Sequence, residues 1–143
     1  WDRSDGAANG SFGWLYAANG DKRNGGSSSS YGDGFSANDI IGVAIDMDNK
    51  AVYFSRNGTF QASGDPTSGS SKTNAAFTNL TGTITAQVYD GSSGQAHEFS
   101  MNFGSPPYSI SSGNSDANGF GNFEYSVPSG YFSLCSSNLA EFG

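Results

Sequence analysis

Asp46 and Asp48 are the pair of carboxylates in this chain best placed for acid-base chemistry. Catalysis by two carboxylates requires that they be held at a set separation on either side of a reacting bond. Here both fall in the corner Asp46-Met47-Asp48-Asn49, and Asp and Asn side chains in such corners usually cap backbone groups of the turn. We therefore expect a structural role for both aspartates, and the sequence predicts a protein that is not an enzyme.

His97 and Cys135 are the only histidine and the only cysteine. One histidine excludes a metal site with two imidazoles, and no nucleophile elbow accompanies it, so we expect His97 to be a solvated loop residue. One cysteine excludes an internal disulfide framework. Since Cys135 ends the apolar run from Tyr131, we predict a buried thiol in a strand, with an intermolecular bridge as the alternative.

Familiar cofactor and metal motifs are missing from the sequence. Counting an EF-hand loop from Asp46 places Ala51 and Asn57 where glycine and glutamate are required. Neither a phosphate-binding loop of the P-loop type nor a Gly-x-Gly-x-x-Gly motif occurs. We expect no metal and no cofactor, with a looser calcium site in the Asp- and Asn-rich loops as the alternative.

The charge of the chain limits its partners. The formal net charge is −7, the sequence pI is near 4.2, and only six residues are lysine or arginine. Nucleic acids and anionic lipids both require clustered basic side chains, so neither is an expected partner. No apolar stretch approaches the roughly 20 residues of a membrane span, so no membrane insertion is expected.

The composition predicts short strands joined by many turns. The 143 residues include 21 glycines, 13% are charged, and no stretch keeps a helical period. A chain of this length forms one core, so we predict a single all-β domain over residues 1–143, an antiparallel β-sandwich with few or no helices.

The clearest local signal is a hairpin between Asp39 and Thr59. Apolar runs at 40–45 and 51–54 flank the Asp46 corner, and the second run stops at Asn57-Gly58, a dipeptide typical of tight hairpin turns. In the first run both alternating faces are apolar, so we expect both strands to lie in the core. Period-two alternation at 83–88 and at 99–103 predicts two further strands with one buried face each.

This hairpin resembles the one that marks the SPRY domain, with the pattern G/N-D-x-I-G-x-x-x-D-x-D-N followed by a strand and R/K-N-G. Asn38 and Lys50 stand here where the family usually has glycine. Segments at 12–16, 20–23, 31–35, 84–89, 99–104 and 128–132 resemble other family segments in the same order. The resemblance implies a concanavalin-like jelly roll that binds short peptides through loops and has no catalytic role.

The chain opens at Trp1 without the two strands that usually begin the family pattern. A sandwich without them would leave sheet edges uncovered. Either the sequence is a processed or partial piece of a longer chain, or a neighbouring copy supplies the strands by β-addition, which would make the protein part of a homo-oligomer.

Long polar loops at 18–34, 61–74 and 109–122 are the natural places for recognition on a rigid sandwich, although they could equally be surface filler. Aromatic residues in or beside them would anchor a partner. The predicted binding residues are Tyr31, Tyr89, Tyr108 and Phe120.

The residues from Asn102 to Leu139 resemble the endings of SPRY-like regions in structural proteins of bacteriophages, especially marine ones. This resemblance implies a virion or extracellular appendage, such as a tail, fibre or capsid decoration. Expected partners are other virion subunits and a host surface protein or glycan. In a glycan-binding variant, Trp14, Tyr31 and Tyr89 would stack on sugar rings. The alternative is a self-assembling structural subunit completed by strand sharing, with no host ligand.

Overall fold

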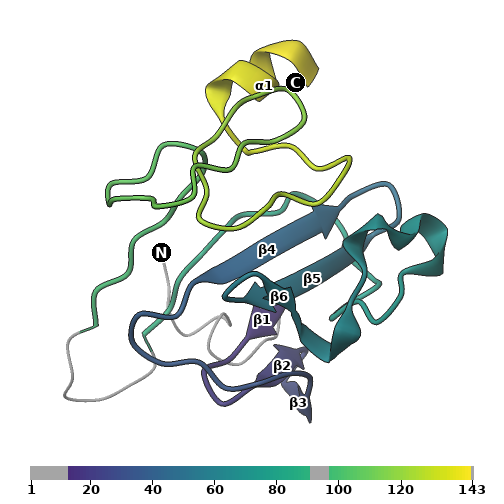
Figure 1. The fold of residues 1–143 in the computed structure, drawn as a ribbon. Coiled ribbons are helices and arrows are strands. Elements are labelled where there is room, and N and C mark those ends of the chain that lie inside the picture. The colour runs from purple at the N-terminus through teal and green to yellow at the C-terminus, as the bar shows by residue number, and fades with distance from the viewer. Residues whose placement is uncertain (1–12, 91–96, 143) are drawn as a thin grey trace. The chain divides into compact units, whose positions relative to one another are not determined.

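The computed structural model describes residues 13–90 and 97–142, and the chain divides into two compact units, Trp1–His97 and Glu98–Gly143. Among the described residues, every strand belongs to the first unit and the one α-helix to the second (Figure 1). No helix in these ranges is long and apolar enough to cross a membrane. The expectation that the first strands of the family pattern are absent concerns residues outside the described ranges and stays a prediction. The expectation of a single domain over residues 1–143 also stays a prediction.

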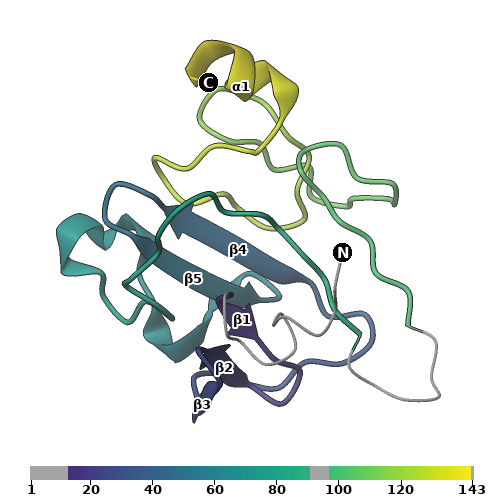
Figure 2. The ribbon, with the colours of Figure 1, turned by 180° about the vertical axis from the view of Figure 1, so that it is seen from behind.

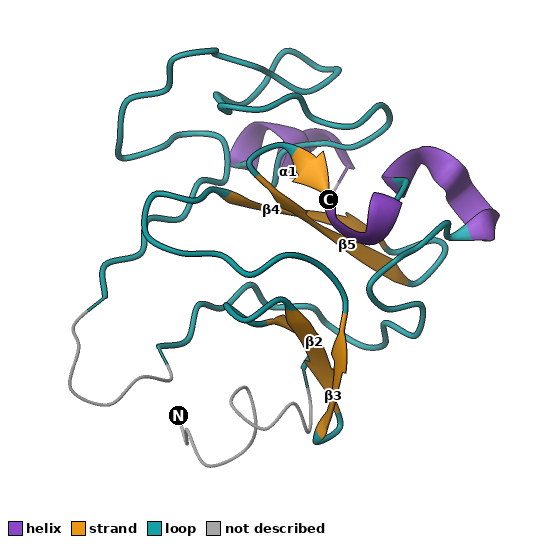
Figure 3. Cartoon of the chain, turned by 60° about the horizontal axis from the view of Figure 1, so that its bottom comes forward, coloured by secondary structure: helices purple, strands orange, loops and turns teal. Residues whose placement is uncertain are grey.

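Two antiparallel sheets of three strands each make up the first unit within the described ranges, with the orders β1-β2-β3 and β4-β5-β6 (Figure 3). The strands are β1 (Leu15–Tyr16), β2 (Asp21–Asn24), β3 (Ser27–Ser30), β4 (Ile41–Asp46), β5 (Ala51–Arg56) and β6 (Thr59–Phe60). Short 3-10 helices follow at η2 (Gln61–Ser63) and η3 (Pro66–Ser71). The all-β prediction is confirmed.

The hairpin of β4 and β5 forms at the predicted corner. Ile41 pairs with Arg56 and Asp46 with Ala51, so the register is continuous along both strands. Asp46 caps the turn, because its carboxylate accepts hydrogen bonds from the Asn49 backbone N–H at 2.9 Å and from the Asn49 side chain at 2.8 Å. This confirms the structural role predicted for Asp46.

Asn38 and Lys50, the residues in place of the usual family glycines, both have left-handed backbones. Their φ angles are 70° and 60°. Asparagine tolerates this conformation better than lysine does, because its short polar side chain can hydrogen-bond locally. Lys50 therefore carries most of the conformational cost of these departures from glycine.

Aromatic side chains from both sheets form one core. Tyr16 of β1 stacks on Phe54 of β5 with ring centroids 5.3 Å apart, and Tyr31 meets both rings edge-on. Val52, Ala76 and Leu80 complete the buried cluster, and Trp14 packs against it. Because β1 and β5 belong to different sheets, this cluster holds the two sheets together.

The prediction that both faces of the 40–45 run are buried is wrong for β4. Ala44 is buried, whereas Val43 and Ile45 on the other face are 56% and 37% exposed. In β5, by contrast, residues 51–55 are all buried. On this other face, Ile41 at the start of β4 packs against the core, whereas Val43 and Ile45 do not.

The predicted strands at 83–88 and 99–103 are also wrong. Both stretches are irregular chain, as Figure 2 shows for the segment after Leu80, and Phe99, Met101 and Phe103 are exposed. Alternation sets the direction of side chains, but a strand also needs a neighbouring backbone to pair with. Neither stretch pairs with another described strand.

A buried carboxylate organises the second unit. Asp116 Oδ1 accepts the backbone N–H groups of Asn118 and Phe120, each at 3.0 Å. Its Oδ2 accepts the N–H and the hydroxyl of Ser133, both at 2.8 Å, and the side-chain amide of Asn138 at 2.7 Å. Burial alone would raise the pKa of Asp116, but these hydrogen bonds hold it well below its ordinary value.

The segment around Cys135 differs from the predicted strand. Irregular chain leads into the helix α1 (Ser136–Phe142), and Asn138 of this helix is the residue bonded to Asp116. Cys135 is half-buried and its sulfur lies 3.4 Å from the Ser133 hydroxyl oxygen. The thiol predicted to be buried in a strand instead lies just before a helix.

Candidate functional site

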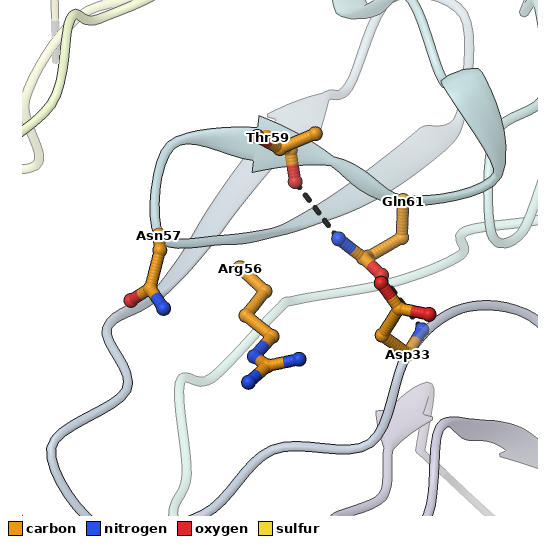
Figure 4. Close-up of a pocket in the computed structure, with 5 residues that line it drawn as sticks. All are labelled: Asp33, Arg56, Asn57, Thr59 and Gln61. Carbon is orange, nitrogen blue, oxygen red and sulfur yellow. Dashed lines mark hydrogen bonds between the residues drawn. The ribbon is translucent and has the colours of Figure 1, made fainter.

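A shallow hollow of about 210 Å³ opens beside the turn between β5 and β6. It is lined by Asp33, Arg56, Asn57, Thr59 and Gln61 (Figure 4). Arg56 ends β5, Thr59 begins β6 and Gln61 begins η2, so most of the wall is one continuous stretch of chain. Asp33 comes from the loop after β3 and closes the other side.

The turn that carries this wall follows from its sequence. Asn57 and Gly58 have φ angles of 49° and 80°, and both central residues of a type I′ turn need positive φ. Arg56 then pairs with Thr59 across the turn. The Asn-Gly dipeptide thus places Arg56 and Thr59 next to each other at the rim of the hollow.

Asp39 connects the turn to the chain segment before β4 through hydrogen bonds. Its Oδ2 accepts the N–H of Ser36 at 2.8 Å, and its Oδ1 accepts the amide of Asn57 at 2.6 Å. The N–H of Ser36, then the Asn57 amide, and more weakly Arg56 lower the pKa of Asp39 to about 2. Asp39 therefore stays ionised at neutral pH as part of the scaffold.

Only one of the three nitrogens of the Arg56 guanidinium contacts another charged group among the described residues. Its Nε lies 3.1 Å from Asp39 Oδ2, but the N–H direction is too far off that oxygen for a hydrogen bond, so the contact is chiefly attraction between charges. Its two terminal nitrogens have no partner among residues 13–90 and 97–142. Figure 4 shows the guanidinium extending into the hollow between Asn57 and Asp33.

Gln61 and Tyr16 hold Asp33 in place through hydrogen bonds to its backbone. The buried Gln61 amide accepts the N–H of Asp33 at 2.7 Å and donates to the carbonyl of Thr59 at 2.9 Å. The Tyr16 hydroxyl donates to the carbonyl of Asp33. Burial first, and then the Asp33 carboxylate, raise the pKa of Tyr16, while the Arg56 guanidinium opposes them, so the charges of both residues act on the Tyr16 hydroxyl.

The side chains that line the hollow are charged or polar and can form hydrogen bonds with a ligand. Its lining has a guanidinium, a carboxylate, two amides and one hydroxyl, with no histidine or cysteine. Asp46 and Asp48 lie at the far end of the β4–β5 hairpin. His97 is exposed and lies 3.0 Å from Asp90, and no described group of three acidic, histidine or cysteine side chains is placed to hold a metal.

The predicted binding residues are in different surroundings. Tyr31 is buried in the aromatic core and its hydroxyl donates to the carbonyl of Asn74 at 3.4 Å, so its ring does not reach the surface. Tyr89 in the first unit, and Tyr108 and Phe120 in the second, are exposed. The binding role of these three stays a prediction. The glycan-stacking variant loses Tyr31 to the core, whereas Trp14 packs against the core and is partly buried.

Sequence reasoning missed the hollow itself. The R/K-N-G pattern marked the turn, and the aspartate of the N-D-x-I pattern was visible, but neither pattern showed that Asp39 holds Arg56 and Asn57 together. The available signal was an arginine followed by the asparagine of a tight turn, Arg56 and Asn57, together with Asp39 just before strand β4. Asp33 and Gln61 carried no signal of their own.

Comparison with known proteins identifies the family. The SPRY domain model matches residues 2–106, about three quarters of the chain. No curated protein and no solved structure matches the chain. The matched range contains both sheets, the aromatic core and every residue that lines the hollow. The chain therefore belongs to the SPRY domain family.

Proposed function

We propose that this chain is a non-catalytic binding module of a phage virion or an extracellular appendage, where it contacts a host surface receptor or neighbouring subunits. SPRY domains are generally protein-protein binding modules. The observation that carries the binding role is the hollow beside Arg56, which presents a guanidinium and a carboxylate on a hairpin held by the Asp39–Asn57 hydrogen bond. Rigid presentation of such groups limits the entropy lost on binding.

The particle assignment rests on the sequence. Residues 102–139 resemble the endings of phage SPRY-like regions, and the chain is acidic and poor in lysine. A net charge of −7 opposes binding to anionic polymers, so recognition would depend on hydrogen bonds, shape and exposed aromatic rings such as Tyr89, Tyr108 and Phe120.

A structural subunit without a host ligand is the second candidate. The observation that favours it is the stretch at 99–103, where Phe99, Met101 and Phe103 alternate with polar residues and are exposed. A strand from another copy could pair with such a stretch. Analytical ultracentrifugation separates the two candidates, because strand sharing predicts stable oligomers of the purified chain and the binding module predicts none.

Antibody labelling tests the particle assignment. Antibodies raised against the purified chain should decorate intact virions from a lysate of the phage that encodes it, as seen by immunogold electron microscopy. An antibody against the major capsid protein of the same phage is the positive control. Labelling confined to debris of lysed host cells would contradict the proposal.

A further inference from the structure

We infer that the hollow between Arg56 and Asp33 binds a primary carboxamide, the side chain of asparagine or glutamine, on a protein partner. The inference rests on the proposed binding role and adds the chemistry of the ligand. A carboxamide carries one acceptor and one donor on the same carbon. The hollow offers the complement of both.

The donor side of the hollow is Arg56. Asp39 attracts the guanidinium at Nε, 3.1 Å from its Oδ2, while the terminal nitrogens of Arg56 have no partner in the described part of the chain. The planar guanidinium presents its N–H groups in fixed directions. A carbonyl oxygen that enters the hollow can therefore accept from Arg56 without any change in the scaffold.

The acceptor side is Asp33. Its backbone is held at both ends of the residue, because its N–H donates to Gln61 at 2.7 Å and its carbonyl accepts from the Tyr16 hydroxyl. Its exposed carboxylate has no partner among the described residues. A free carboxylate on a fixed backbone is a ready acceptor for an N–H group.

The lining of the hollow carries one charge of each sign. Asp39 is paired with Arg56 and does not line the hollow, so the charged groups that a ligand meets are the Arg56 guanidinium and the Asp33 carboxylate. A ligand carboxylate would be attracted by Arg56 but repelled by Asp33, and an ammonium group would meet the opposite pair of forces. Only a neutral group with an adjacent acceptor and donor uses both walls without repulsion.

A side chain fits the lining better than a sugar ring does. None of the five lining residues is aromatic, and the rings of Tyr16 and Tyr31 are buried in the core. Sugar rings generally gain much of their affinity by stacking on exposed aromatic faces. A saccharide is therefore the alternative that the test must address.

The test uses the full chain labelled with ¹⁵N and four small probes: acetamide, acetate, methylammonium and methyl glucoside. Acetamide should shift the backbone amide signals of Asp33 and of residues 57–61 in a saturable way, at lower concentration than the other three probes. Asp33→Asn should weaken acetamide binding by about fivefold, because a neutral amide oxygen is a weaker hydrogen-bond acceptor than a carboxylate. The same substitution should strengthen acetate binding by removing the repulsion.

Asp48→Asn is the matched control. It also removes one exposed carboxylate, but from the β4–β5 corner, and should leave both affinities unchanged. Tighter binding of acetate than of acetamide to the unmodified chain would overturn the inference, and so would equal effects of the two substitutions. Saturable shifts with methyl glucoside at these amides would replace it with a saccharide site. Silence with all probes would reject the carboxamide site, while virion labelling would still decide the proposed function.

Discussion

Asn57 and Asp39, 18 residues apart in the sequence, are joined side chain to side chain by a hydrogen bond of 2.6 Å. The Asn57 side chain also accepts the backbone N–H of Ile40 at 2.9 Å. One amide thus ties the β5–β6 turn to the segment that leads into β4. The φ angle of Asn57 is 49°, and few residues adopt this left-handed conformation without a cost in free energy.

Replacing Asn57 should separate these two contributions. Asn57→Ala loses both the bridge and the tolerance of a left-handed backbone, so we expect the free energy of unfolding to fall by about 2 kcal/mol. Asn57→Gly loses only the bridge and should cost about 1 kcal/mol. Urea denaturation followed by tryptophan fluorescence measures both values. Equal losses would show that the backbone conformation contributes nothing.

Acid should loosen the Asp39 anchor over a defined pH range. Its pKa falls from the ordinary 3.8 to about 2 on folding, so the anchor stabilises the fold above pH 4. This stability is lost as the pH falls from about 4 to about 2. The protection of the Ile40 and Asn57 amides against hydrogen exchange, measured relative to a free peptide at the same pH, should fall across that window. In Asp39→Asn, this protection should already be lower at pH 6 and should change less with acid.

Alkali should act on Tyr31. Burial raises its pKa to about 12, so its hydroxyl is neutral wherever the fold is intact below that pH. Stability should be unaffected below pH 10, the ordinary tyrosine pKa, and should fall as the pH rises toward 12. Tyr31→Phe should lessen this alkaline loss, as measured by urea denaturation at pH 8 and pH 11. An unchanged pH dependence in that variant would place the alkaline-sensitive group elsewhere.

Two glycines with positive φ should respond differently to alanine. At Gly20 a Cβ would lie 2.3 Å from the backbone oxygen of Gly32, which is fixed by its neighbours, whereas at Gly25 nothing lies within 4 Å. Gly25→Ala should cost about 1 kcal/mol for the left-handed backbone alone. Gly20→Ala should cost about 1–3 kcal/mol more, because the backbone must move. Thermal unfolding of both variants would show whether this ordering holds.

Replacing Lys50 with glycine should stabilise the protein at the β4–β5 corner. Lys50 has a φ of 60°, so Lys50→Gly should raise the free energy of unfolding by about 0.5–1 kcal/mol. Asn38→Gly should gain less, because asparagine already tolerates a left-handed backbone. Lys50→Ala is the control, since it removes the charge without relieving the backbone and should bring no gain. A gain with alanine would point to the charge instead.

The hairpin could be predicted from the sequence because its rules are local. Asp46 beside Asn49, and Asn57 before Gly58, specify their corners through short-range hydrogen bonds and backbone preferences. The resemblance to the SPRY family also located the positions of Asn38 and Lys50, where the structure shows left-handed backbones.

Features that depend on distant partners could not be predicted. Tyr31 is in a Gly- and Ser-rich stretch typical of a surface loop, yet its ring packs edge-on against both Tyr16 and Phe54. The alternation at 99–103 gave no information on whether a neighbouring strand exists. The hollow needs Asp33, Arg56 and Gln61 to converge, and no pattern within any one segment specifies such a meeting.

The polar interior of the second unit should affect the heat capacity change of its unfolding. Its buried residues in the described range are Asp116, Ser133 and Asn138, whereas every buried apolar residue belongs to the first unit. The heat capacity change of unfolding comes mainly from apolar surface exposed to water, so it should be small for residues 98–142. Cooling, which weakens apolar burial, should therefore loosen the aromatic core before it loosens the Asp116 network.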